Sequence, residues 1–70
     1  MAKWSQVYLM RGGILYRTVT VVDKMGSAWL ARDERGRDYR LTNLQKDRDG
    51  YFETHNWMIR TTSGSWAKID

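Results

Sequence analysis

The sequence predicts an all-β domain of five to seven short strands with at most one helical turn. Turn-forming residues recur about every 8–12 residues, as they do in β-meanders, sandwiches and barrels. The segments between these turns are rich in β-branched and aromatic residues, which suit a pleated, half-buried surface. No segment keeps the apolar spacing of a helix over three turns. The chain has 70 residues, so we expect residues 1–70 to form a single β domain.

The first half of the chain contains four expected strands, separated by turns that contain glycine: residues 4–11, 14–22, 28–31 and 39–42. The second of these is almost entirely β-branched or aromatic, and its alternation places Val19 and Val21 on one face. In the fourth, Tyr39 and Leu41 alternate with polar residues, which indicates one buried and one solvated face. The turn between the third and fourth strands is a tight Asp-Glu-Arg-Gly sequence at residues 33–36.

The second half of the chain contains shorter elements. Residues 42–45 could hold a single helical turn, with Thr42 or Asn43 as its cap. Beyond Gly50 the expected strands are residues 51–54, 57–62 and a short closing strand at 66–69. The apolar positions of all these strands predict a core of eight residues: Val7, Leu9, Val19, Val21, Leu30, Leu41, Phe52 and Ile59.

Residues 19–23 and 29–44, with Gly26 between them, form the pattern of two successive hairpins followed by the expected helical turn. Over about residues 14–46 this pattern resembles the central meander of small SH3-like β-barrels. In that fold, successive hairpins curl until the sheet nearly closes, and a helical turn often precedes the last strand. The resemblance implies a small SH3-like barrel or a curled antiparallel sheet. An OB-like barrel and an open, strongly twisted sheet are the alternatives.

Catalysis and metal binding have little support in the sequence. With no cysteine and one histidine, the chain cannot form a closed zinc site. His55 lies in an expected turn, and no spacing supplies the partner that a general base needs. The acidic cluster at residues 47–50 lacks the terminal glutamate of a calcium loop. We therefore expect a protein that is not an enzyme and has no catalytic residues, no metal and no cofactor.

The sequence also limits the place where the protein works. No run approaches the roughly 18 apolar residues of a membrane span. Residues 1–6 lack the apolar run of a signal peptide. We expect a cytoplasmic protein with no membrane partner. A compact, cysteine-free single domain also fits the small accessory proteins of phages and plasmids, which often bind one host protein.

Charge and aromatic residues together favour nucleic-acid binding. Lys and Arg number 12 against 8 Asp and Glu, so the net charge is +4, and basic side chains bind phosphates. We expect Tyr8 and Tyr16 to share an outward sheet face beside Arg17, where rings could stack on bases. Half of the basic residues lie among acids at residues 32–49, which indicates a salt-bridged surface there. The predicted nucleic-acid-binding residues are Lys3, Tyr8, Arg11, Tyr16, Arg17 and Arg60; the sequence does not distinguish DNA from RNA.

Protein binding is the alternative hypothesis. The chain has 4 Trp, 4 Tyr and 4 Met, which is more than so small a core can bury. Exposed aromatic residues mark interfaces, and Trp29 is the ring that we expect in the core. The predicted protein-binding residues of such an inhibitor or adaptor are Trp4, Tyr51, Trp57 and Trp66. An exposed strand edge could also pair with a partner or with a second copy, which would give a homodimer.

Overall fold

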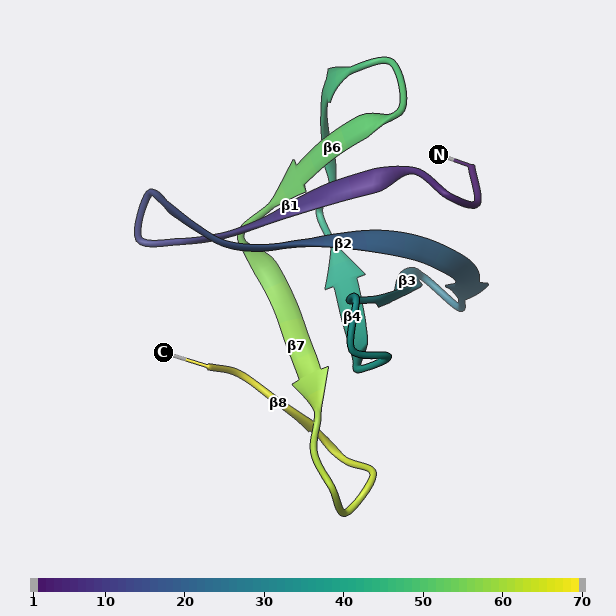
Figure 1. The fold of residues 1–70 in the computed structure, drawn as a ribbon, viewed down its shortest axis with the longest axis vertical. Helices are drawn as coiled ribbons and strands as arrows, with labels where there is room; N and C mark the ends of the chain where they lie inside the picture. The colour runs from purple at the N-terminus through teal and green to yellow at the C-terminus, as the bar shows by residue number, and fades with distance from the viewer. Residues whose placement is uncertain (1, 70) are drawn as a thin grey trace.

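The computed structural model describes residues 2–69, which contain eight strands and no helix (Figure 1). The strands are β1 (Gln6–Arg11), β2 (Ile14–Met25), β3 (Ala28–Arg32), β4 (Asp38–Thr42), β5 (Gln45–Arg48), β6 (Tyr51–Thr54), β7 (Asn56–Arg60) and β8 (Trp66–Ala67). The predicted all-β class is confirmed, with one strand more than the expected maximum. Within residues 2–69, no helix has the length and apolarity needed to span a bilayer.

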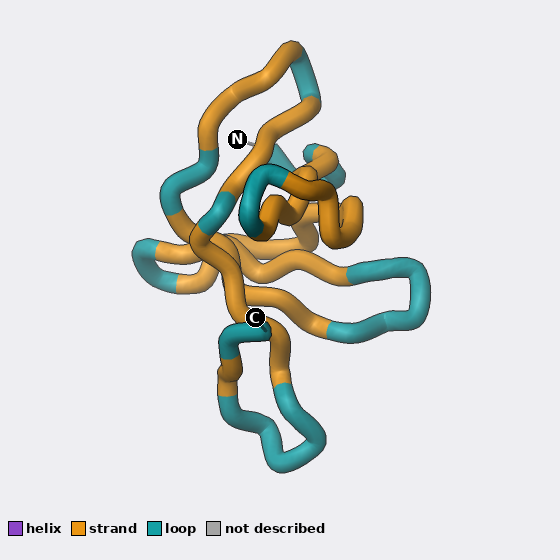
Figure 2. The backbone as a smooth tube through the Cα atoms, turned by 90° about the vertical axis from the view of Figure 1, so that its left-hand side faces the viewer, coloured by secondary structure: helices purple, strands orange, loops and turns teal. Residues whose placement is uncertain are grey.

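All eight strands belong to one sheet, in the order β5-β6-β1-β2-β3-β4-β7-β8. Successive hairpins join β1 to β4, and every neighbouring pair is antiparallel except β1 and β6, which run parallel. Within the segment 51–60, β6 pairs with β1 and β7 pairs with β4. This segment therefore joins the two edges of the β1–β4 meander and curls the sheet. Figure 2 shows the hairpin loops projecting from this central body of strands. The sheet is therefore mixed, whereas the sequence predicted an antiparallel one.

The core lies on the inner side of the curled sheet. Its fully buried members are Val7, Leu9, Val19, Val21, Ala31, Tyr39, Leu41 and Trp57. Phe52 and Ile59, which were expected in the core, are partly buried and pack against it. Leu30 was also expected there, but this prediction is wrong. Its neighbour Ala31 faces the core, and strand alternation turns Leu30 to the other side, where it is half-buried.

The corner between β4 and β5 contains no helical turn, so the prediction for residues 42–45 is wrong. Asn43 adopts a φ of 52°, a left-handed conformation that asparagine tolerates, and β5 begins two residues later. Buried Thr54 stabilises this corner. Its hydroxyl donates a hydrogen bond to the Thr42 carbonyl and accepts one from the Asn56 N–H. A side chain thus satisfies backbone groups where the chain leaves β6 for β7.

Candidate functional site

Strand alternation creates a solvent-facing surface on β1, β2 and β6. Tyr8 lies between the buried Val7 and Leu9, so its side chain points away from the core. The register places Thr18 and Glu53 beside Tyr8 on the two neighbouring strands. We call this surface the outer face. Its members on β1, β2, β3, β5 and β6 are Gln6, Tyr8, Thr18, Thr20, Arg32, Gln45, Arg48, Tyr51 and Glu53.

Tyr8, Tyr51 and Arg48 form a cluster on the outer face, which we call the tyrosine platform. The ring centroids of Tyr8 and Tyr51 lie 6.1 Å apart, with an interplanar angle of 20°. The Arg48 guanidinium carbon lies 4.1 Å from the Tyr51 centroid, and its Nη2 donates to the Tyr8 hydroxyl at 3.3 Å. Such contacts combine aromatic stacking with a cation–π interaction. The sequence predicted Tyr8 and Tyr51 under separate hypotheses and did not identify Arg48.

A hollow of about 580 Å³ adjoins the platform across β1 and β2. Gln6 and Thr20 line it, and the Gln6 Nε2 donates to the Thr20 hydroxyl at 3.0 Å. Trp4 also lines it, and 73% of the Trp4 surface is exposed. The Trp4 N–H donates to the Val21 carbonyl at 2.8 Å, so the backbone is held while the ring faces solvent. Aromatic rings therefore lie at two places, the tyrosine platform on the outer face and Trp4 beside this face.

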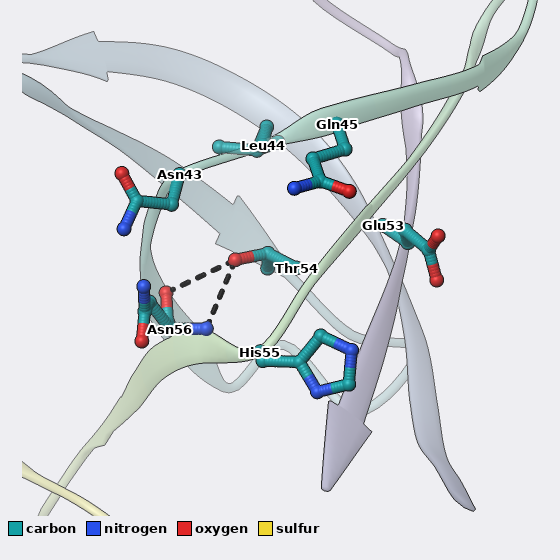
Figure 3. Close-up of a pocket in the computed structure, with 7 residues that line it drawn as sticks. All are labelled: Asn43, Leu44, Gln45, Glu53, Thr54, His55 and Asn56. Atoms are coloured by element: carbon teal, nitrogen blue, oxygen red, sulfur yellow. Dashed lines mark hydrogen bonds between the residues drawn. The ribbon is translucent and has the colours of Figure 1, made fainter. Parts of the chain in front are cut away.

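A second, polar hollow of about 370 Å³ lies at the corner between β6 and β7 (Figure 3). Its lining residues are Asn43, Leu44, Gln45, Glu53, Thr54, His55 and Asn56. His55, as expected, occupies an exposed position between two strands. Glu53 belongs both to this corner pocket and to the outer face. Among residues 2–69, no group of three His, Asp or Glu side chains is placed to hold a metal ion.

The predicted grouping of Tyr8, Tyr16 and Arg17 on one face does not form. Leu9 pairs with Arg17 and Met10 with Leu15, so Tyr16 is the extra residue of a β-bulge. A bulge re-aims side chains, and Tyr16 packs on the core ring Trp57 at 4.9 Å between centroids. Tyr16 nevertheless stays 39% exposed. The Arg17 side chain lies on the inner face beside Leu9, where its Nη1 donates to Asp33 at 2.8 Å. Of the three residues, only Tyr8 belongs to the platform.

Arg17 is one of several donors around the carboxylate of Asp33, whose side chain is only 2% exposed. The carboxylate also accepts the Tyr39 hydroxyl at 2.8 Å, the Arg37 Nε at 3.2 Å, and the N–H groups of Arg35 and Arg37. Burial raises the pKa of Asp33, but these hydrogen bonds outweigh it and hold that pKa well below its usual range. Burial and the neighbouring carboxylate raise the pKa of Tyr39. Hydrogen bonding to Asp33 raises the pKa of Arg17. Arg17 is therefore committed to a structural ion pair.

Trp57 is buried, which contradicts its predicted role as an exposed protein-binding residue. Its surface is 2% exposed, and its indole Nε1 donates to the Met10 carbonyl at 2.9 Å. It takes the central place that the sequence assigned to Trp29, which is only partly buried against the core. The predicted Arg11 lies with its guanidinium carbon 4.3 Å from the Trp57 ring centroid. Arg11 thus belongs to the β1–β2 hairpin and not to the platform.

The remaining predicted residues lie apart from one another. Lys3 is exposed in the turn that precedes β1. Arg60 on β7 has its Nη1 3.6 Å from Asp38, and its guanidinium carbon lies 4.7 Å from the ring centroid of Trp66 on β8. These strands stand at the opposite end of the sheet order from β5 and β6. The structure therefore does not gather the six predicted nucleic-acid-binding residues into one site.

Comparisons of this chain with protein-family models, curated proteins and solved structures find no match. The chemistry of the outer face is therefore the basis for assigning a function. This face presents two half-buried tyrosine rings, an exposed guanidinium, and amide and hydroxyl groups, and the exposed Trp4 ring lies beside it. Such a surface suits a ligand that is planar, polar at its edges and negatively charged along its backbone.

Proposed function

We propose that this protein is a non-enzymatic, cytoplasmic module that binds single-stranded nucleic acid across the outer face. The tyrosine platform is the observation that carries the proposal. Stacking of a base on an aromatic side chain contributes about 1–3 kcal/mol and tolerates any base sequence. The Arg48 side chain is 62% exposed, so it can turn from the Tyr51 ring to a phosphate with little loss of packing.

A single strand fits this surface better than a duplex does. Bases of a duplex are stacked on one another, whereas unpaired bases can be splayed onto protein rings. From the platform, a strand could cross Gln6 and Thr20 and reach the exposed ring of Trp4, because all three residues border the adjoining hollow. The SH3-like resemblance is compatible with this use of a sheet face but does not by itself assign a function.

Fluorescence anisotropy with labelled single-stranded DNA and RNA 12-mers tests the proposal. We expect affinity to fall steeply between 50 and 200 mM salt, as counterion release requires. Tyr51→Leu should weaken binding about tenfold, because one stacking contact is lost. Arg48→Ala should lower the salt slope by about 0.7, the value for one phosphate of a single strand. Arg40→Ala, on β4, removes the same charge outside the outer face and should leave that slope unchanged.

Two results would refute the proposal: no binding at 50 mM salt, or binding that Tyr51→Leu and Arg48→Ala leave intact. Circular dichroism on each variant must first show an unchanged β spectrum. DNA and RNA differ at the 2′-hydroxyl, and the paired oligonucleotides report which of them the protein prefers.

Protein binding remains the second candidate, and the exposed hairpin tip favours it. Ile14 and Leu15, at the β1–β2 turn, are 72% and 51% exposed, and apolar side chains presented this way suit a protein interface. Trp4 offers a further exposed ring. In this case the protein would be a small phage- or plasmid-type inhibitor or adaptor that engages one host protein. The exposed edge strand β5 also leaves pairing with a second copy open.

Pull-down from a lysate with and without nuclease distinguishes the two candidates. A single dominant partner that survives nuclease and is lost with the Ile14→Ser, Leu15→Ser double variant supports protein binding. Partners that disappear after nuclease treatment support nucleic acid. Light scattering after gel filtration measures the oligomeric state of the protein alone.

A further inference from the structure

We propose that the corner pocket between β6 and β7 reads the edge of a base stacked on the tyrosine platform, and that it selects guanine. This inference rests on the proposed binding of single-stranded nucleic acid. Its central residue is Glu53, which the sequence did not single out. The inference concerns the ligand's identity, because platform stacking alone would accept any base.

The sheet register places Glu53 directly beside the platform. Glu53 pairs with Tyr8 in the parallel β1–β6 ladder and with Gln45 in the β5–β6 ladder. Cross-strand neighbours of this kind have their side chains on the same face, about 5 Å apart. A base stacked on the Tyr8 ring would therefore present one edge to Glu53, with Gln45 on the far side. Figure 3 shows Glu53, Gln45 and His55 around the same pocket.

The Glu53 carboxylate is available to a ligand. No hydrogen bond or ion pair between residues 2–69 engages it, although it is only partly exposed. The nearest cationic strand, β5, directs its charges elsewhere: the Lys46 Nζ lies 2.8 Å from Asp49, and the Arg48 Nη1 lies 3.7 Å from Asp47. The Glu53 oxygens reach solvent, so water satisfies them in the free protein, and a ligand that displaces this water must supply donors in its place.

Guanine is the base whose edge meets this need. Its Watson–Crick edge carries two adjacent donors, N1–H and the N2 amino group, which can bind both oxygens of a carboxylate. Adenine and cytosine each offer one amino donor beside an acceptor nitrogen, and uracil and thymine offer one donor flanked by two carbonyls. These bases would bring an acceptor against Glu53. The amide of Gln45 supplies a donor for guanine O6 on the same edge.

The negative charge of Glu53 also explains why the pocket would discriminate between bases. A carboxylate beside a phosphate-binding surface repels the nucleic-acid backbone and weakens binding of every sequence. Two charge-assisted hydrogen bonds to guanine offset that repulsion, whereas the other bases leave it in place. Selectivity therefore arises from the penalty on the wrong bases as much as from the attraction of the right one.

Anisotropy with thymidine 12-mers that carry one central G, A, C or inosine tests the inference. We expect the G-containing strand to bind about tenfold more tightly than the all-thymidine strand, as one bidentate contact predicts. Inosine lacks the N2 amino group and should lose most of this gain. Glu53→Gln should reduce the G preference to less than threefold while all-thymidine binding holds or improves. Asp23→Asn removes an equal charge from an exposed position on β2 and should leave the preference for G intact.

The outcomes separate this inference from the proposed function. Binding that depends on Tyr51 but shows no preference for G, or a preference that Glu53→Gln leaves unchanged, overturns the guanine assignment and leaves the proposed function standing. Equal affinity for G and inosine also overturns it. If the protein binds none of the strands at 50 mM salt, both proposals fail.

Discussion

Replacing Asp33 should destabilise the fold more than any other change of a single charge. Its carboxylate joins the β3–β4 turn to Arg17 on β2 and to the buried hydroxyl of Tyr39 on β4. Asp33→Ala leaves that hydroxyl without its acceptor, which costs about 1–3 kcal/mol. The freed N–H groups of the turn add about 1 kcal/mol. Arg17 and Arg37 are 33% and 41% exposed, so water screens their ion pairs and each contributes less than about 1 kcal/mol.

These terms place the loss for Asp33→Ala at about 2–6 kcal/mol, centred on about 4 kcal/mol. Asp33→Asn keeps one oxygen for the N–H groups of the turn, but it replaces the oxygen that accepts Tyr39, Arg17 and Arg37 with an amide NH2 group and removes the charge. We expect a loss of about 2 kcal/mol. A chain of this length is stabilised by roughly 4–10 kcal/mol in total. The Asn variant should therefore unfold roughly 10 °C below the wild type, and the Ala variant should be near the limit of folding.

The pH dependence gives this prediction a second test. The folded-state pKa of Asp33 lies below its unfolded value, so the folded state holds the proton less tightly. The stabilisation is then fully present above about pH 5 and is lost as the pH falls toward the folded-state pKa. The stability gap between the wild type and Asp33→Asn should be full at pH 7 and should narrow at pH 3.

Thermal and urea unfolding, followed by circular dichroism at both pH values, measure the effect. Asp23→Asn is the control, because it changes an exposed acid on the same sheet and should cost less than about 0.5 kcal/mol. The reasoning is refuted if Asp33→Asn is as stable as this control at pH 7. A gap that stays constant down to pH 3 would show that the charge is not what stabilises the turn.

Two further changes test the core and the corner. Trp57→Phe keeps most of the ring but removes the indole donor from the Met10 carbonyl, so we expect a loss of about 2 kcal/mol in urea unfolding; unchanged stability would mean that this bond contributes little. Thr54→Val keeps the side-chain shape but leaves the Thr42 carbonyl and the Asn56 N–H unpaired, and it should cost about 1–3 kcal/mol. Thr54→Ser retains the hydroxyl and should recover most of that loss, whereas equal losses in both variants would point to packing instead.

Local pattern predicted the parts of this fold that depend on near neighbours. Strand alternation is a property of consecutive residues, and it correctly buried Val7, Leu9, Val19 and Val21. It did less well within β3, where either alternate set could face inward. The larger Leu30 was expected in the core, but Ala31 is the residue that lies beside the buried Val21 and Tyr39.

Local sequence also did not show which tryptophan lies at the centre of the core. Nothing within a few residues of Trp29 or Trp57 distinguishes a central ring from a peripheral one. Trp57 is central because β7 pairs with β4 and brings the ring against Tyr16 and Tyr39, which come from other strands. The bulge that places Tyr16 against Trp57 likewise depends on how β1 and β2 pair, and the sequence of neither strand alone predicts it.

By itself, the sequence determined that this protein is a small all-β domain. It also showed that the chain has more aromatic residues than so small a core can bury and more basic than acidic residues. Composition and alternation are enough for that conclusion, because they act over a few residues. Only the tertiary structure decided which of those residues form a surface. Tyr8 and Arg48 are 40 positions apart in the chain, and they meet because β6 lies parallel to β1 and carries β5 with it. That pairing reflects closure of the whole curled sheet around its core, which no local stretch of sequence encodes.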